Sequence, residues 1–334
     1  MKKKRVAING FGRIGRLAFK IMRERADLEV VAINDLSDNN TLAHLLKYDT
    51  AYKTYKYDVS ATDTHIKVGK KSVHAFSERD PKKLPWKKLK IDIVLEATGI
   101  FRDKKTAGMH ISAGAKRVVI SAPSKGDGID GFVRGVNCHT YQGQTIIDNA
   151  SCTTNCTAPV VTVLESVFGI EKAMLTTIHS YTAGQNLQDG SHKDLRRARA
   201  AAQNIVPTTT GAAKATTKII PQLKGKFDGI AVRVPTITVS LTDFTFLLSK
   251  DVTIEKVNKA LIKASKGPMK GILGVSNVPL VSSDFIGDDR SSIVDLEMTR
   301  VVDGNLVKVV AWYDNEWGYA NRLVELTQIV GRQM

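Results

Sequence analysis

The sequence has only three cysteines, Cys138, Cys152 and Cys156, which is too few and too odd a number for a disulfide framework. It lacks any uninterrupted apolar run of the roughly 18 residues that a membrane-spanning helix needs. The first residues are basic, but polar residues and glycine follow where a signal peptide has its apolar stretch. We therefore expect a cytoplasmic protein with reduced thiols and no membrane partner.

Acidic residues are the scarcer charge, because 33 Asp and Glu stand against 49 Lys and Arg, for a formal net charge of +16. Such an excess attracts anions, which include phosphate, nucleotides and nucleic acid. The sequence has no aromatic RNA-binding motif, no helix-turn-helix pattern and no arginine-rich tail. A nucleic-acid-binding protein is thus an alternative of a different class, and we expect no specific nucleic-acid partner.

Short apolar runs alternate with amphipathic stretches in the first 150 residues. Strands are expected at 5–9, 29–35, 91–97, 117–121 and 145–148, and helices at 13–24 and 104–113. This alternation is typical of an α/β fold with a doubly wound Rossmann sheet, and a period-two pattern over 49–73 indicates inserted antiparallel strands. Later strand-like runs with few crossover helices indicate an α+β second domain with a mixed sheet.

Three glycines, Gly10, Gly12 and Gly15, form a G-x-G-x-x-G pattern between the first expected strand and the first expected helix. Asp35 ends the second expected strand, about 20 residues after Gly15. In this context the glycines allow a tight turn, close approach of a pyrophosphate to the backbone, and packing of helix on strand. Asp35 is expected to accept hydrogen bonds from the adenosine ribose. The pattern predicts a dinucleotide site.

A second group of residues centres on Cys152, which we expect at the start of a helix capped by Ser151. The helix dipole and free N–H groups there are expected to lower the pKa of the thiol and to hold an oxyanion. His179 ends a strand-like run at 174–179, and a Cys–His pair is one way to activate a nucleophile.

Other features of this region carry further expectations. Pro159 predicts a kink or a restart of the helix. Cys156, which follows Cys152 by one helical turn, is expected to be buried. No spacing of Cys and His resembles a zinc site, so we expect no metal.

Arginines, hydroxyl side chains and a glycine occur at 194–199, at 208–211 and at Arg233. These groups are typical of phosphate recognition. They lie in or near a polar stretch at 183–218 with little periodicity, and so long a loop is uncommon unless it has a function. With a dinucleotide fold, a reactive thiol and a base, they predict an enzyme that oxidises a phosphorylated aldehyde through a thioester.

Six separated motifs, at 8–16, 151–155, 179–182, 194–199, 207–214 and 312–316, identify a resemblance over the whole chain. The sequence resembles phosphorylating glyceraldehyde-3-phosphate dehydrogenases. The resemblance implies oxidation of D-glyceraldehyde 3-phosphate to 1,3-bisphosphoglycerate with inorganic phosphate and NAD, in a homotetramer. It also implies an NAD-binding Rossmann domain at 1–150 with the C-terminal helix 316–334, a catalytic domain at 151–315, and an S-loop at about 183–205.

The resemblance also implies residue roles. Cys152 matches the nucleophile and His179 its base. Substrate and phosphate contacts match Ser151, Thr153, Thr182, Arg197, Thr210, Gly211 and Arg233. Cofactor contacts match Gly10, Gly12, Arg13, Ile14, Gly15, Asp35, Arg79, Ser121 and Asn315.

One position departs from the pattern of strictly NAD-dependent members. Ser191 stands where these often carry a proline, and a serine hydroxyl can hold the 2′-phosphate of NADP. Asp35 opposes that phosphate by like charge, so we expect NAD to be preferred, with dual NAD and NADP use as an alternative. An erythrose-4-phosphate dehydrogenase is a further alternative, which Thr153, Thr210 and Arg197 disfavour because that enzyme needs no inorganic phosphate.

Overall fold

The computed structural model describes residues 3–334, which fall into two compact units. The first contains the chain up to Phe132 together with Asn137–Ala150 and Ala320–Met334. The second contains Val133–Val136 and Ser151–Tyr319. The chain thus changes unit between residues 150 and 151, whereas the C-terminal segment of the first unit begins inside the last helix, at 320 rather than 316.

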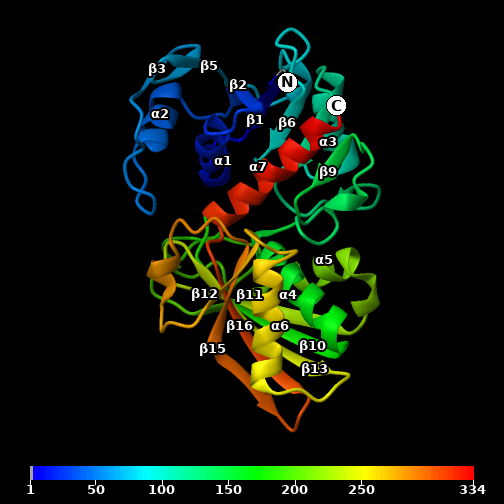
Figure 1. Ribbon diagram of the computed structural model, residues 1–334. Coiled ribbons are helices and arrows are strands. Elements are labelled where there is room, and N and C mark those ends of the chain that lie inside the picture. The colour runs from blue at the N-terminus through cyan, green and yellow to red at the C-terminus, as the bar shows by residue number, and fades with distance from the viewer. Residues whose placement is uncertain (1–2) are drawn as a thin grey trace. The chain divides into compact units, whose positions relative to one another are not determined.

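The first unit is built on a nine-stranded sheet in the order β3-β4-β5-β2-β1-β6-β7-β9-β8 (Figure 1). Its strands are β1 (Lys4–Asn9), β2 (Leu28–Asn34), β3 (Val59–Thr62), β4 (His65–Val68), β5 (Lys71–Phe76), β6 (Ile93–Glu96), β7 (Arg117–Ile120), β8 (Asp130–Gly131) and β9 (Ile146–Asp148). Its helices are α1 (Arg13–Arg23), α2 (Asn39–Lys47) and α3 (Lys104–Ser112).

Parallel pairing dominates this sheet, as the alternating sequence pattern predicts. β2, β1, β6, β7 and β9 pair in parallel, whereas β3, β4 and β5 pair antiparallel, as expected for the inserted strands. The strand order reverses at β1, because β2 lies on one side of it and β6 on the other. Ligands of such sheets bind outside the carboxyl ends of the strands at this reversal.

Local sequence accounts for the helices of this unit. α1 buries Leu17, Ala18 and Ile21, which recur on one helical face. The helix α2 is not expected from the sequence pattern, and it begins at Asp38, whose side chain accepts a hydrogen bond from the Thr41 N–H.

The second unit is built on a seven-stranded mixed sheet in the order β11-β12-β10-β13-β16-β15-β14. Its strands are β10 (Ile170–Ser180), β11 (Val206–Thr209), β12 (Phe227–Val234), β13 (Ser240–Leu248), β14 (Leu273–Ser276), β15 (Ser292–Val302) and β16 (Leu306–Tyr313). The helices α4 (Cys152–Phe168), α5 (Ala212–Ile219) and α6 (Ile254–Lys266) pack on one face of this sheet (Figure 1). The last helix, α7, spans Trp317–Arg332.

The core of the second unit lies between these helices and the sheet. Buried apolar side chains of α4, such as Val160 and Leu164, pack with Phe244 and Phe246 of β13. Of the kink or restart expected at Pro159, the restart is wrong, since α4 is one helix of 17 residues with the proline inside it, and the kink stays a prediction. Among residues 3–334, no helix is long and apolar enough to cross a membrane.

Candidate active site

The turn between β1 and α1 has the shape that a dinucleotide needs. Gly10 has a φ of +92°, and a Cβ there would overlap the backbone of Ala97 and Thr98. A Cβ on Gly15 would overlap the carbonyl oxygen of Gly10, so only glycine lets α1 pack this closely. A Cβ on Gly12 would meet no atom within 4 Å, which leaves open space for a pyrophosphate to approach the backbone.

Asp35 is fixed beside this turn. Its carboxylate accepts hydrogen bonds from the Phe11 N–H at 2.8 Å and the Ser37 N–H at 3.0 Å. The side chain is partly exposed, so its remaining lone pairs can accept hydrogen bonds from ribose hydroxyls. The glycine turn and Asp35 therefore fit NAD as a pair.

The other expected cofactor residues of the first unit lie at three strand ends. Arg13 and Ile14 begin α1, and the Arg13 guanidinium forms an ion pair with Asp49 at 2.6 Å. Arg79 follows β5 and is exposed, and Ser121 directly follows β7. All of these positions come after the carboxyl ends of their strands.

In the second unit, the structure brings Cys152 and His179 into contact. Cys152 is the first residue of α4, whose cap Ser151 accepts a hydrogen bond from the Thr154 N–H. His179 lies near the carboxyl end of β10. The Cys152 Sγ and the His179 Nε2 are 3.4 Å apart, which is hydrogen-bond distance for sulfur.

Hydrogen bonding defines which nitrogen of His179 carries the proton. Its Nδ1 lies 2.7 Å from the Ser180 carbonyl oxygen, which can only accept. Nδ1 is therefore the protonated nitrogen, and the lone pair of Nε2 faces the thiol. The Arg233 NH1 lies 3.1 Å from this Nδ1 and 3.0 Å from the Ser180 carbonyl oxygen. Because both nitrogens carry hydrogen, Arg233 donates to the carbonyl oxygen and not to the ring.

Burial and the neighbouring guanidinium set the charges of this pair. Burial, assisted by the charge of Arg233, lowers the pKa of His179 to about 3, so its imidazole is neutral at physiological pH. Burial also raises the pKa of the Cys152 thiol, although Arg233 and the N–H groups at the start of α4 act in the opposite direction. The expectation of a lowered thiol pKa is wrong, because desolvation outweighs these stabilising groups, and the resting pair is a neutral thiol and a neutral imidazole.

A cationic region adjoins this pair. The parallel register of β10 and β12 places Arg233 directly beside His179. The Nε of Arg233 is buried without a hydrogen-bond partner, and no carboxylate among the described residues forms an ion pair with it. Arg197 lies close enough for its charge to lower the pKa of Arg233 further, beyond the effect of burial. Arg197 is ion-paired with Asp194 at 3.4 Å, whereas the Arg233 Nε has no partner within residues 3–334, and two guanidiniums this close together make a site for an anion.

Thr210 and Gly211 lie next to Arg197. Arg197 donates to the Thr208 Oγ1 at 2.9 Å and to the Thr209 carbonyl oxygen at 3.3 Å, which ties it to β11. Thr210 and Gly211 follow this strand, and Gly211 caps the N-terminus of α5. A Cβ on Gly211 would meet no atom within 4 Å, so its backbone is open to a ligand.

Three other expected residues have different surroundings. Thr153 is buried, and its hydroxyl lies 3.0 Å from the hydroxyl of Tyr313. Thr182 follows the end of β10, and its N–H bonds the side chain of Gln185 at 3.3 Å. Ser191 is exposed in the segment between β10 and β11 that corresponds to the expected S-loop.

Tyr313 lies inside the motif at 312–316, but the sequence analysis assigns it no role. Its hydroxyl contacts Thr153 at 3.0 Å and Thr177 at 2.8 Å, and its ring lies edge-on to His179 with centroids 6.0 Å apart. It therefore connects the start of α4 to the end of β10. As a sequence signal it offers only an aromatic residue at a buried strand end, which is usual for core positions.

Asn315 and Cys156 lie in the second unit as well. The Asn315 Oδ1 accepts a hydrogen bond from the Ser240 Oγ at 2.9 Å, which leaves the amide NH₂ as a donor. Cys156 is fully buried, as expected, and burial raises the pKa of its thiol to about 12. Within residues 3–334, no cluster of three or more His, Cys, Asp or Glu side chains could hold a metal ion.

Two family models match the chain. The NAD binding domain of glyceraldehyde 3-phosphate dehydrogenase matches residues 4–104, and the C-terminal domain of the same enzyme matches residues 151–315.

Whole-length relatives agree with the family models. The chain is 54% identical over 335 residues to glyceraldehyde-3-phosphate dehydrogenase 2 of Nostoc sp., across 98% of this chain and 99% of that protein. It is 54% identical over 336 residues to the chloroplastic glyceraldehyde-3-phosphate dehydrogenase A of Chlamydomonas reinhardtii, across 99% and 90% of the two chains. It is 51% identical over 328 residues to glyceraldehyde-3-phosphate dehydrogenase of Geobacillus stearothermophilus, across 98% of each chain.

Proposed function

We propose residue roles for this chain from the premise that it belongs to the glyceraldehyde-3-phosphate dehydrogenase family. Its activity is the oxidative phosphorylation of glyceraldehyde 3-phosphate, with NAD bound by the first unit. In this proposal Cys152 is the nucleophile and His179 is its base. The observation that carries it is the 3.4 Å contact between the thiol and the unprotonated Nε2.

The acylation step follows from this geometry. As the Cys152 sulfur attacks the aldehyde carbon, a C–S bond forms and the C=O π bond breaks. The thiol proton passes to the His179 Nε2 and from there to the former carbonyl oxygen, which leaves a thiohemiacetal hydroxyl and a neutral imidazole. The N–H groups at the start of α4 lie against the sulfur and stabilise negative charge as it develops there. The Ser180 carbonyl oxygen holds the Nδ1 proton, so the ring keeps its orientation while it gains and loses a proton.

Oxidation and phosphorolysis complete the reaction. Bound NAD supplies the acceptor for the hydride that leaves the carbon attached to sulfur. His179 takes the hydroxyl proton as the C=O bond forms, and a thioester remains on Cys152. A phosphate oxygen then attacks the thioester carbon, the C–S bond breaks, and the protonated His179 returns its proton to the departing sulfur, which restores the neutral thiol and the neutral imidazole.

The cationic region supplies the phosphate sites in this proposal. Arg233 and Thr182 would hold the phosphate of the substrate, and Arg197, Thr210 and Gly211 the attacking inorganic phosphate, with contributions from Ser151 and Thr153. The partnerless Nε of Arg233 and the open backbone at Gly211 support this assignment. Thr153 would act mainly through its N–H, because its hydroxyl is bound to Tyr313.

We further propose that the enzyme prefers NAD. Asp35 would hold the ribose hydroxyls, whereas its charge would repel a 2′-phosphate. The exposed hydroxyl of Ser191 supports NADP as a second, weaker cofactor. The ratio of kcat/KM for NAD and NADP tests this proposal, and equal values would contradict the preference.

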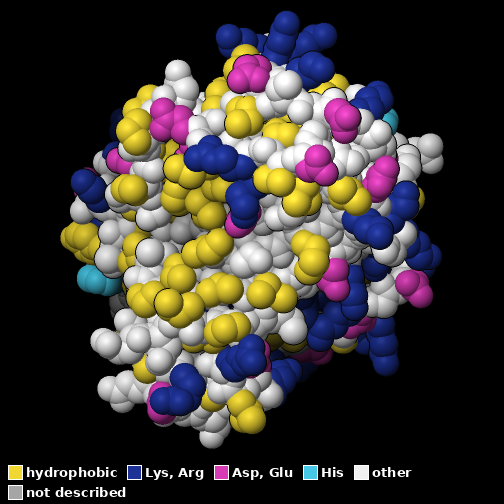
Figure 2. All heavy atoms as spheres, turned by 90° about the horizontal axis from the view of Figure 1, so that it is seen from below, with side chains coloured by type: hydrophobic (Ala, Val, Ile, Leu, Met, Phe, Trp, Pro, Cys, Tyr) yellow, Lys and Arg dark blue, Asp and Glu magenta, His cyan; other side chains and the backbone are white. Residues whose placement is uncertain are grey.

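A homotetramer is proposed as the working assembly. The segment between β10 and β11 exposes Leu187, Leu195 and Ile205, each more than 70% accessible in the isolated chain, and the sheet exposes Met174 and Ile230. Figure 2 shows a face on which hydrophobic side chains gather in a band with few charges. Exposed apolar patches of this kind mark interfaces. Light scattering after size exclusion should give a tetramer mass, and a monomer mass would contradict the proposal.

A cytoplasmic location is part of the proposal, because the mechanism needs Cys152 as a free thiol. Subcellular fractionation tests this location.

Rapid mixing tests the catalytic roles. The wild type should release a burst of NADH when aldehyde and NAD are added without phosphate, and phosphate should then restore turnover. Cys152→Ser should give no burst while it still binds NAD. His179→Asn should give a burst that is slower by a factor on the order of 100 to 10,000. A normal burst from Cys152→Ser would contradict the assignment.

A further inference from the structure

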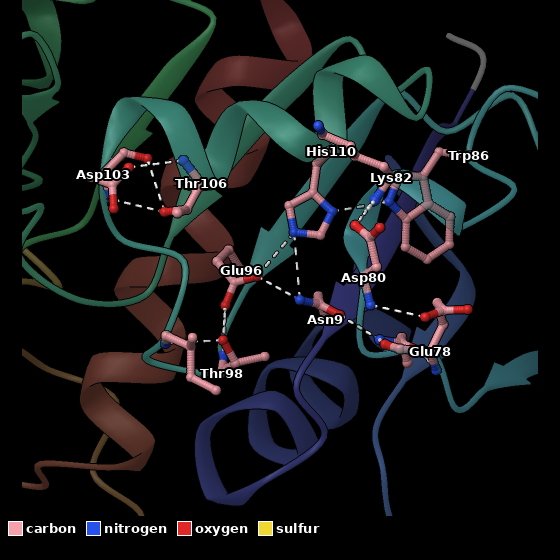
Figure 3. A network of polar contacts seen from close by, with 12 residues as sticks. Asn9, Glu78, Asp80, Lys82, Trp86, Glu96, Thr98, Asp103, Thr106 and His110 are labelled. Atoms are coloured by element: carbon pink, nitrogen blue, oxygen red, sulfur yellow. Dashed lines mark hydrogen bonds and ion pairs between the residues drawn. The ribbon is translucent and has the colours of Figure 1, made fainter.

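A buried polar cluster lies at the carboxyl ends of three strands of the first unit (Figure 3). Asn9, Asn34 and Glu96 are the last residues of β1, β2 and β6. The Glu96 side chain meets His110 of α3, and both side chains have no solvent exposure. The proposed mechanism uses none of these residues. A buried carboxylate is costly unless donors satisfy it, so this arrangement calls for a physical explanation.

The hydrogen bonds define the charges in the cluster. The Trp86 Nε1–H can only donate, and it donates to the His110 Nδ1 at 3.1 Å. In a neutral ring the proton is therefore on Nε2, which donates to the Glu96 Oε2 at 3.0 Å. Asn9 donates to the same oxygen at 2.6 Å, and the N–H and hydroxyl of Thr98 both donate to Oε1. Four donors converge on one carboxylate, so Glu96 is ionised and His110 is neutral.

One branch of the cluster reaches the glycine turn. Because both donors of Thr98 bind Glu96, the backbone of residues 97 and 98 is held in one position. Gly10 packs so closely on this backbone that a Cβ would overlap the Thr98 nitrogen. The position of Glu96 therefore determines where the glycine turn lies.

A second branch reaches the adenosine side of the site. The Asn34 Nδ2 donates to the Asn9 Oδ1 at 2.7 Å and to the Glu78 carbonyl oxygen at 2.8 Å. The Glu78 N–H donates back to the Asn34 Oδ1 at 2.8 Å. Asp35 follows Asn34 and Arg79 follows Glu78, so two of the proposed cofactor residues adjoin members of the cluster.

We propose that the ionised Glu96, oriented by neutral His110, is a positioning residue for NAD. It holds the glycine turn and the loop after β6 directly, and through Asn9 and Asn34 it holds the backbone at Asp35 and Arg79. The loops then have their binding geometry before the cofactor arrives, which reduces the ordering cost of binding. Glu96 is 1% exposed, so it acts through these loops rather than on the cofactor itself. This inference takes one thing from the proposed function, namely that the ligand is NAD.

The test compares two isosteric substitutions in the full-length protein. Glu96→Gln replaces one acceptor oxygen with an NH₂ group that faces other donors. We expect calorimetry to show about tenfold weaker NAD binding, a matching rise in the KM for NAD, and unchanged kcat and KM for the aldehyde. The control is Asp92→Asn, at the other end of β6, where the carboxylate accepts the Arg5 N–H at 2.9 Å and Lys116 at 2.7 Å. This control should leave NAD binding unchanged.

Two outcomes would overturn the proposal: NAD binding that is unchanged in Glu96→Gln, or binding that is weakened equally in both variants. If Glu96→Gln does not fold, hydrogen exchange of the wild-type protein tests the proposal instead. The amides of Thr98 and Ile100, which donate to Glu96 and to the Thr98 hydroxyl, should be protected without NAD. Exchange at the rate of an unfolded chain would overturn the inference. A wild type that binds no NAD would instead contradict the proposed function.

Discussion

Replacement of His179 by glutamine should make the protein less sensitive to acid. In the folded wild type, burial lowers the pKa of His179 from 6.5 to about 3, so the ring remains neutral while the unfolded chain binds a proton. Between these pH values the unfolded state holds one more proton, and stability therefore falls as the pH falls. Well above pH 6.5 neither state binds a proton at this residue, and the effect vanishes. Glutamine does not titrate, so the variant lacks this contribution.

The size of the effect follows from linkage. One proton bound only by the unfolded state changes the free energy of unfolding by about 1.4 kcal/mol per pH unit. Between pH 6.5 and 4.5, where the unfolded histidine passes from half to full protonation, the wild type should lose about 2 kcal/mol more than His179→Gln. Other acid-sensitive groups, such as Asp49 and Asp92, are common to both proteins and cancel in the difference.

The assay is urea unfolding at fixed protein concentration between pH 4.5 and 7.5. The difference between the two free energies of unfolding should be constant above about pH 7 and should shift steadily below it. The control is His139→Gln, which removes an exposed imidazole. Its free energy of unfolding, plotted against pH, should run parallel to that of the wild type. If the curve of His179→Gln is also parallel to the wild type, His179 is not held neutral by burial, and the assignment of its Nε2 as the base loses its premise.

Three further substitutions test other parts of the account. Gly15→Ala forces a methyl group against the Gly10 carbonyl oxygen, so it should destabilise the protein by about 1–3 kcal/mol and weaken NAD binding. Calorimetry that shows an unchanged affinity for NAD would refute the close packing. Arg233→Lys keeps the charge but loses the guanidinium fork, and it should raise the KM for the aldehyde about tenfold with an unchanged KM for NAD; a rise in both would point to a general defect. Asp35→Ala removes the charge that opposes a 2′-phosphate, so the ratio of kcat/KM for NADP to kcat/KM for NAD should rise about tenfold. If this ratio is unchanged, Asp35 does not select the cofactor.

The parts of the fold that depend on nearby residues could be predicted from the sequence. The β1–α1–β2 unit is confirmed because apolar periodicity, glycine spacing and strand ends are all local signals. The mixed sheet of the second unit is confirmed for the same reason, since β12, β13 and β16 are strongly apolar runs. The helix α2 was harder to predict, because only three of its nine residues are buried and its main local signal is the Asp38 cap.

Properties that depend on three-dimensional packing and backbone direction could not be predicted. The thiol of Cys152 has a raised pKa because of burial, which the position at a helix start does not reveal. The tautomer of His179 depends on the Ser180 carbonyl, whose direction is set by the end of a strand. The cluster at Glu96 joins residues from three strand ends and a helix, and sequence spacing gives no sign of this arrangement. The roles of the expected site residues remain predictions.

The most direct test of the central claim is the mass of the protein after reaction with glyceraldehyde 3-phosphate and NAD in the absence of phosphate. Rapid acid quenching and peptide mapping should locate one glyceroyl-phosphate acyl group on the peptide that contains Cys152, and addition of phosphate before the quench should remove it. An acyl group on another residue, or NADH formation without any acylated peptide, would contradict a thioester on Cys152.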